Sequence, residues 1–383
     1  MKALITGNMA AAIGAKLCRP EVLSAYPITP QTTIIEYLAK MVADGELTAE
    51  YIKVESEHSA MAACIGAVAA GSRTFTATSS QGLLLMHEML WQASGLRLPI
   101  VMVNVNRAVG APWTIFPDQN DSLAQRDTGW IQIYCENGQD VLDTIIQAYR
   151  IAEIVSLPVM VVSEGFVLSH TSAPTEIPEQ GKVDEFLPPY QPKWKLDLDN
   201  PAAYGAHVNS NQYAELRRDI QGAMDEVYGV YSEVAEQFYG IFGRRYPAVE
   251  LIGSRNAEII LVTSGTTTGT ARQVLKDLNS DKIALMQIRM FRPFPYDLVR
   301  ELSWRASKIA IIDRNISFGS RGIFAESVRS SLYDAPSRPS IFEFILGIGG
   351  VDITPEVISK VIDFADSHQY PSSLKPIWQE ELK

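Results

Sequence analysis

Cysteine is scarce in this sequence: 383 residues contain three, Cys18, Cys64 and Cys135, and no Cys-x-x-Cys pair. This content excludes the disulfide framework of a small secreted protein and favours a reducing compartment, so we expect the protein in the cytoplasm. Iron–sulfur clusters are held by sets of cysteine thiolates, and these distant cysteines do not supply a cluster site from this chain alone.

Basic charge and long apolar runs are also lacking. The 33 Lys and Arg residues are outnumbered by 44 Asp and Glu residues, which gives a net charge of −11. Without a basic surface, nucleic acid and anionic membranes are not expected as direct partners. No apolar run approaches the ~20 residues that span a bilayer. Gly7-Asn8 interrupts the start of the chain, so we expect no signal peptide either.

Several motifs of common chemistry are missing as well. The five histidines are scattered without a zinc-ligand spacing, and no Gly-x-Ser-x-Gly elbow occurs. The turn Gly265-Thr-Thr-Thr-Gly269 could cradle a phosphate at the start of a helix. It lacks the lysine of a P-loop and the third glycine of a dinucleotide fingerprint, so a structural turn is the favoured interpretation.

Alternating strand and helix patterns are what the sequence does contain. They run from Val22 to Val162 and predict a mainly parallel sheet covered by helices on both faces. A proline-rich connector over 171–205 and a long helix over 211–242 follow. A second α/β unit begins at Ala257, with buried-strand patterns at 258–263, 283–288 and 308–313. The fold class is therefore α/β, with more than one domain.

The stretch Val54–Arg73, VESEHSAMAACIGAVAAGSR, lies between two predicted strands, 51–54 and 74–78. Its helical part has few large or charged side chains, so both of its sides are expected to be covered. Small residues along this helix would let another backbone approach closely; they are Ala62, Gly66, Ala69 and Ala70.

Glu57 stands where the first of these strands ends and the helix begins. Burial disfavours the charged form of a carboxyl group, so an acid at the mouth of such a helix is a candidate proton donor. The alternative is that Glu57 only stabilises the positive end of the helix.

Four turns that follow predicted strands carry Thr29, Glu57, Gln81 and Arg107. In parallel sheets the ligand crevice lies at the carboxyl ends of the strands, so these turns are expected to open onto one site. A purely architectural role remains the alternative for each turn taken alone.

Two of these residues have side chains suited to a ligand. The Thr29 hydroxyl could bond a ligand or only its own turn. The guanidinium of Arg107 could fork onto a carboxylate ligand. Its alternative is an ion pair with an acid of the same loop, Asp118 or Asp121.

A series of motifs occurs in one order along nearly the whole chain. They are YPITP (26–30), ESEHSA (55–60), FTATSSQG (75–82), NR (106–107), QRDTGW (125–130), RPFP (292–295) and GIGG (347–350). In this order they resemble the alpha subunit of 2-oxoacid:ferredoxin oxidoreductases of the pyruvate synthase type.

The resemblance implies an architecture and a set of partners. Residues 1–246 would form a thiamine diphosphate-enzyme pyrimidine-binding domain that ends with the connector and the long helix. Residues 247–383 would form a transketolase C-terminal-like α/β domain. A beta subunit would hold the diphosphate and Mg²⁺, and this chain agrees because it has no Gly-Asp-Gly followed by Asn at the usual distance. Gamma and delta or ferredoxin-like subunits would carry the iron–sulfur clusters, with a flavin subunit where NAD is the acceptor.

The resemblance also implies a reaction and residue roles. The 2-oxoacid would be oxidatively decarboxylated to acyl-coenzyme A and CO2, with electrons passed through clusters to ferredoxin or NAD. Glu57 would bond the aminopyrimidine nitrogen of thiamine diphosphate and so help to activate it. Arg107 would pair with the substrate carboxylate. Thr29 would bond cofactor-bound or substrate oxygen.

The loop Gly110–Asn120 departs from what the resemblance implies for pyruvate enzymes, because it carries Trp113 and Phe116. The hypothesis is a substrate larger than pyruvate, either a branched-chain or an aryl 2-oxoacid such as phenylglyoxylate. The alternative is that these aromatic residues belong to the core or to an interface. Two other functions remain open: a thiamine-dependent transferase or decarboxylase without redox chemistry, and a non-catalytic assembly subunit.

Overall fold

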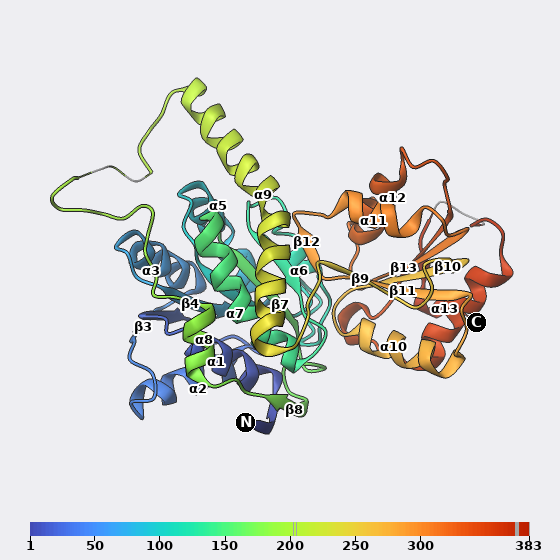
Figure 1. The fold of residues 1–383 in the computed structure, drawn as a ribbon, viewed down its shortest axis with the longest axis horizontal. Coiled ribbons are helices and arrows are strands. Elements are labelled where there is room, and N and C mark those ends of the chain that lie inside the picture. The colour runs from blue at the N-terminus through green and yellow to red at the C-terminus, as the bar shows by residue number, and fades with distance from the viewer. Residues whose placement is uncertain (202, 204, 372–374, 383) are drawn as a thin grey trace.

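The computed structural model describes residues 1–201, 203, 205–371 and 375–382. It shows two α/β units side by side, with the long helix α9 running between them (Figure 1). None of the helices in the described ranges has the length and hydropathy of a membrane span.

The first unit is built on a seven-stranded sheet of order β12-β6-β7-β5-β4-β2-β3. All neighbouring strands are parallel except β12, which pairs antiparallel with β6. The strands are β2 (Val22–Ala25), β3 (Glu50–Lys53), β4 (Thr74–Thr78), β5 (Val101–Asn106), β6 (Ile131–Tyr134), β7 (Val159–Glu164) and β12 (Met290–Arg292).

Helices cover both faces of this sheet, as predicted. Strand β5 shows why, because its side chains alternate between faces: Val101 and Val103 pack with α1 and α7, whereas Met102 packs with α3 and α5. The helices are α1 (Gly7–Leu17), α2 (Thr32–Ala43), α3 (Glu57–Ala69), α4 (Ser80–Leu85), α5 (His87–Gly95), α6 (Asn120–Leu123) and α7 (Gly138–Val155).

This chain covers only one face of α3. Its outer face is exposed, since Ala62, Gly66 and Ala70 are exposed and only Ala69 of these four small residues is buried. The cover that was expected on this second side is not supplied by the described part of this chain. The inner face packs on the sheet through Met61 and others, which explains the apolar composition on that side alone.

The connector is more ordered than its proline content predicts. It contains β8 (Ser172–Glu176), which pairs antiparallel with β1 (Lys2–Thr6), and α8 (Gln180–Phe186). Helix α9 (Ser210–Phe242) packs its C-terminal half on the first unit, whereas its N-terminal half projects beyond it (Figure 1).

The second unit has a six-stranded sheet of order β15-β14-β13-β10-β11-β9, parallel except for β9. The three predicted strands form its centre. The strands are β9 (Val249–Ile252), β10 (Ile259–Thr263), β11 (Ile283–Ile288), β13 (Lys308–Asp313), β14 (Ser340–Ile345) and β15 (Ile377–Trp378). The helices are α10 (Thr267–Leu278), α11 (Tyr296–Ser303), α12 (Ile323–Leu332), α13 (Pro355–Ser367), and the 3-10 turns η1 (Ile348–Gly350) and η2 (Gln379–Glu381).

The two units are tied together by shared strands and buried ion pairs. Strand β12 lies in the second half of the sequence but extends the first sheet. Buried Arg289 pairs with Asp140, and buried Arg314 pairs with Glu164, each across the junction. One apolar cluster also contains residues of both units, so they form one packed body.

Candidate active site

Four strand ends of the first sheet converge on one place, as predicted. Nη1 of Arg107, which follows β5, donates to the carbonyl oxygen of Thr29 at 2.7 Å. Its Nη2 donates to Oε1 of Gln81, which follows β4, at 2.5 Å. The carboxylate of Glu57, which follows β3, lies against Gly82 beside Gln81. The carboxyl edge of the sheet is therefore a single site made from four turns.

Glu57 is held at the start of α3 with little exposure to solvent. Ser56 caps the helix by accepting from the amide of Ser59, and this fixes Glu57 in the first turn. Only 7% of Glu57 is exposed. A Cβ on Gly82 would lie 2.5 Å from Glu57 Oε1 and 2.7 Å from Thr78 Oγ1, so only glycine leaves room for the carboxylate there.

The guanidinium of Arg107 is bonded only to neutral groups. It is 9% exposed, and among the described residues no ion pair engages it. Asp121 accepts from its backbone amide at 3.2 Å and not from its guanidinium, so the alternative pairing with an acid of the same loop is absent from these contacts. Burial lowers the pKa of Arg107, against the opposing effect of the Asp121 and Glu57 carboxylates. A buried cation of this kind can bind a carboxylate ligand.

Thr29 lies at the rim of the site. Its carbonyl holds Arg107, while its side chain is exposed and its hydroxyl has no hydrogen bond within the described part of the chain. The hydroxyl is therefore available to a ligand.

The carboxylate of Asp121 accepts several hydrogen bonds that hold these turns together, a role that the sequence did not reveal. Its buried carboxylate accepts from the amide of Ser80 at 2.9 Å and from the side-chain amides of Asn104 and Asn106. Burial raises its pKa to about 6, although these hydrogen bonds oppose the rise. The usable signal was Asn104 and Asn106, two polar residues in a buried strand that need a partner.

Ser80 shows the strain that this arrangement carries. Its φ of 49° lies in the left-handed region, where a residue other than glycine is uncommon. Two hydrogen bonds hold it there: its amide donates to Asp121, and its hydroxyl donates to the carbonyl of Ala108 at 2.7 Å. Such strained residues cluster at functional sites.

Several buried polar atoms at this edge have no hydrogen-bond partner among the residues that the structure describes. They are Thr78 Oγ1, Ser79 Oγ, Gln81 Nε2 and Arg107 Nε. Burying such groups without hydrogen bonds costs free energy, so they indicate a polar ligand or partner. With the acid of Glu57 and the cation of Arg107, they fit a nitrogen heterocycle and a carboxylate.

Other chemistry is not favoured by the side chains present. Within the described ranges, no group of three or more His, Cys, Asp or Glu residues is placed to hold a metal ion. The three cysteines are buried, and burial raises the pKa of each thiol, that of Cys64 to about 12. Thiols in such surroundings are poor nucleophiles.

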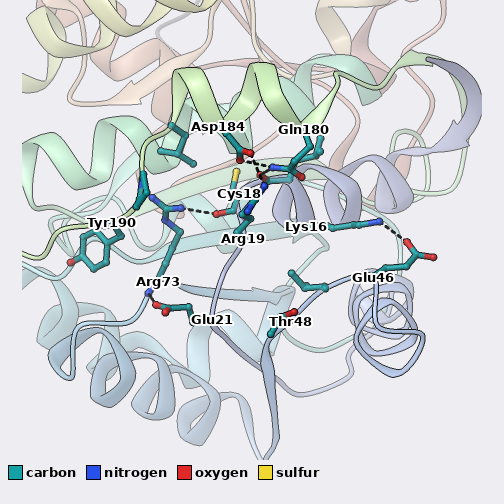
Figure 2. A pocket seen from close by; sticks show the side chains of 14 residues that line it. Lys16, Cys18, Arg19, Glu21, Glu46, Thr48, Arg73, Gln180, Asp184 and Tyr190 are labelled. Atoms are coloured by element: carbon teal, nitrogen blue, oxygen red, sulfur yellow. Dashed lines mark hydrogen bonds and ion pairs between the residues drawn. The ribbon is translucent and has the colours of Figure 1, made fainter.

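A cavity lies at the opposite, amino edge of the first sheet. It has a volume of about 840 Å³ and is lined by charged side chains (Figure 2). These side chains pair with one another: Lys16 with Glu46 at 2.5 Å, and Arg19 with Asp184 at 2.6 Å. Because its charges are paired within the chain and it lies far from Glu57 in the fold, we do not assign the reaction to it.

The Gly265–Gly269 turn is structural, as the sequence favoured. The Glu164 carboxylate accepts from the amide of Thr266 at 3.3 Å and from its hydroxyl, and it pairs with Arg314. A carboxylate of the first unit thus occupies the anion position at the start of α10.

Fold and site together define a class: an enzyme subunit of the thiamine diphosphate-binding type. Residues 13–236 match the family model for the thiamine diphosphate-binding part of pyruvate flavodoxin/ferredoxin oxidoreductases. Residues 257–358 match core domain II of pyruvate:ferredoxin oxidoreductase.

Curated relatives are similar over almost the full length. The chain is 48% identical over 364 residues to pyruvate synthase subunit PorA of Methanothermobacter thermautotrophicus, covering 94% of each chain. It is 45% identical to ketoisovalerate oxidoreductase subunit VorA of Pyrococcus horikoshii, covering 95% of this chain and 93% of that one. The chain therefore belongs to the 2-oxoacid:ferredoxin oxidoreductase family, as an alpha subunit.

A solved structure shares the fold. It is the 2-oxoglutarate:ferredoxin oxidoreductase from Magnetococcus marinus with 2-oxoglutarate, coenzyme A and succinyl-CoA bound. The TM-score is 0.71 at 22% identity, over 95% of this chain and 65% of that chain. The present chain thus spans about two thirds of that longer polypeptide.

Proposed function

We propose that this chain contributes the acidic half of a thiamine diphosphate site in a multisubunit enzyme. The enzyme oxidatively decarboxylates a 2-oxoacid to acyl-coenzyme A and CO2, and its electrons pass to iron–sulfur clusters on other subunits and then to ferredoxin or NAD. The observation that carries the proposal is the buried Glu57 at the start of α3, packed against Gly82.

Each site residue has a task in this reaction. When bound, thiamine diphosphate supplies the carbon nucleophile and the electron sink. Glu57, buried at the start of α3, would hydrogen-bond the pyrimidine nitrogen. Arg107 binds the substrate carboxylate with guanidinium donors that, among the described residues, bond only neutral groups. The Thr29 hydroxyl bonds an oxygen of the substrate or of the bound cofactor.

A beta subunit is proposed to close the site and to hold the diphosphate and Mg²⁺. The open face of α3 supports this, since Ala62 and Gly66 leave its backbone accessible to another helix. Exposed apolar side chains on the turns at the same sheet edge also support it. They are Tyr26, Leu85, Trp113, Ile115, Phe116 and Val167. Gamma and delta or ferredoxin-like subunits, with a flavin subunit where NAD is the acceptor, complete the proposed complex.

The substrate is proposed to be pyruvate or a bulkier branched-chain or aryl 2-oxoacid. The names of the relatives include both pyruvate synthase and ketoisovalerate oxidoreductase. Trp113 is 70% exposed and Phe116 is 49% exposed, so neither is a core residue of this chain. Both are therefore open to contact with substrate or with a partner subunit.

We also propose 1–246 and 247–383 as the two domains, which the family matches on either side of that boundary support. Three unpaired cysteines support a cytoplasmic location.

The test is Glu57→Gln in the assembled complex. Coenzyme A-dependent reduction of a dye with a panel of 2-oxoacids should fall by about 10²–10⁴-fold, because the proton donor is lost. Glu55→Gln is the matched control, since Glu55 is an exposed acid two residues earlier that bonds only Ser59 in this region. Unchanged turnover in Glu57→Gln would favour the assembly-subunit alternative. Turnover without any cluster-bearing subunit would favour the non-redox alternative.

A further inference from the structure

The Gly347–Gly350 turn follows β14 in the second unit and lies against a loop of the first unit. Three of its residues have positive φ values: 70° at Gly347, 61° at Gly349 and 86° at Gly350. Side chains other than glycine rarely adopt these angles. The turn is held from behind by Gln379, whose Oε1 accepts from the Gly347 amide at 2.9 Å.

Close packing explains why Gly350 must lack a side chain. A Cβ there would overlap Phe116 Cβ, and it would lie 3.1 Å from Phe116 Cγ and 3.3 Å from Pro117 Cδ. At Gly349 a Cβ would lie 3.5 Å from Thr114 Cγ2, an ordinary contact distance. The backbone of the second unit is thus pressed directly onto the loop that carries Thr114 and Phe116.

The same loop is tied to the site on its other side. The carbonyl of Phe116 accepts from the amide of Ala108 at 3.0 Å, and Ala108 directly follows Arg107. Beyond the loop, the Gln119 amide donates to the carbonyl of Arg314 in the second unit at 2.8 Å. Phe116 therefore lies between the glycine turn and the residue next to the proposed carboxylate-binding arginine.

The loop does not hold its position by burying its own side chains. Trp113, Ile115 and Phe116 are all about half exposed or more. It is held by contacts on three sides: the hydrogen bond between the Ala108 amide and the Phe116 carbonyl, the packing of the Phe116 ring on Phe166 with 5.3 Å between ring centroids, and the glycine turn. The glycine turn is a contact that the second unit contributes.

We propose that the Gly347–Gly350 turn is a specificity-determining element: it positions the loop of residues 110–117 and so sets which 2-oxoacid side chain the site accepts. The inference rests on the proposed function and adds the second unit to it. Gly350 is a positioning residue, since it acts through Phe116 and does not touch the reacting atoms.

The experiment is Gly350→Ala in the assembled complex. We compare kcat/KM for 2-oxoisovalerate with kcat/KM for pyruvate. The added methyl group would push Phe116 away from the turn and shift the loop whose Phe116 carbonyl bonds the Ala108 amide, next to Arg107. The ratio should therefore change by about tenfold, as a methyl-sized change in a pocket can produce. A loss of folded or assembled enzyme lowers both kcat/KM values by the same factor, so their ratio is unchanged.

Gly319 serves as a matched control for backbone strain. It has a φ of 84° with nothing within 4 Å of a Cβ. Gly319→Ala should therefore leave the ratio unchanged. An equal change in Gly319→Ala would overturn the inference, because strain alone would then suffice.

Gln379→Ala is the second variant and decides the matter if Gly350→Ala does not assemble. It adds no atoms, and it frees the turn from the Gln379 bonds to the Gly347 amide and to the Asp352 carbonyl. A smaller change in the same ratio is expected, and an unchanged ratio in the variant that assembles overturns the inference. If the wild-type complex oxidises no 2-oxoacid, the proposed function fails instead.

Discussion

Both edges of the first sheet carry charged side chains, but their arginines differ: Arg73 at the amino edge is paired with an acid, and Arg107 at the carboxyl edge is not, within the described part of the chain. At the amino edge, Arg73 donates to Glu153 at 2.7 Å and to the carbonyl of Cys18 at 2.8 Å. At the carboxyl edge, the Arg107 guanidinium bonds only neutral acceptors among the described residues, and its Nε has no partner among them. The amino edge holds a cavity of about 840 Å³ whose charged side chains are paired with one another, so the presence of a cavity does not by itself identify the site. A buried charged group without an ionic partner does identify the site, because a ligand of opposite charge can supply the missing interaction.

The largest expected effect tests the amino edge. Arg73→Ala should lower the free energy of unfolding by about 3–5 kcal/mol, because Glu153 is left buried without its partner. Denaturant unfolding of the chain measures it, with turnover per assembled complex unchanged. Lys16→Ala, which breaks the more exposed pair with Glu46, is the control and should cost less than about 1 kcal/mol. Equal losses of unfolding free energy in the two variants would mean that the Arg73–Glu153 pair stabilises the fold no more than the exposed Lys16–Glu46 pair does.

Gly82→Ala tests the carboxyl edge without replacing a charged residue. The new Cβ would displace the Glu57 carboxylate, and a misplacement of about 1 Å can cost about 10²-fold in rate. We expect that loss in kcat with every 2-oxoacid, measured by dye reduction. Gly95→Ala, a helix-end glycine with nothing within 4 Å, is the control. Normal kcat in Gly82→Ala would mean that the position of Glu57 is not critical.

Arg107→Lys tests the same edge, because it keeps the positive charge and removes the planar guanidinium with its several donors. Lysine cannot reproduce the two bonds to Thr29 and Gln81 while binding a carboxylate. KM for the 2-oxoacid should rise by about tenfold, with a smaller change in kcat, as expected for one weakened charge-assisted bond. Steady-state kinetics at saturating coenzyme A give both values. A fall in kcat alone would argue that Arg107 does not bind the substrate.

A further expected effect concerns pH. Burial raises the pKa of Asp121 to about 6, whereas an unfolded aspartate titrates near 4. The folded protein binds this proton more tightly, so the stabilising contribution is complete below about pH 4 and is lost as the pH rises through about 6. The difference in unfolding free energy between Asp121→Asn and wild type should change by up to about 1.4 kcal/mol per pH unit in that window. A difference that is flat with pH would contradict the assignment.

Sequence reasoning succeeded where one periodic pattern determined the outcome. The alternation of strands and helices predicted the parallel sheets, and the rule for their carboxyl ends brought Thr29, Glu57, Gln81 and Arg107 together. Their chemical roles remain predictions, since position alone does not test them.

Long-range packing explains the rest. Strand β12 has only three residues and joins a sheet that ends more than a hundred residues earlier, which no local pattern encodes. The contact of Gly350 with Phe116 also depends on how two units meet. The sequence did not show that the outer face of α3 is exposed in this chain. An apolar helix has the same sequence pattern whether the elements that pack on it come from its own chain or from another one.

The exposed face of α3 has a consequence for the proposed complex. Glu57 lies in the first turn of the same helix, so a beta subunit that docks on this face would act directly on the helix that positions Glu57. The proposed function therefore predicts that a newly made copy of this chain is inactive until that subunit binds.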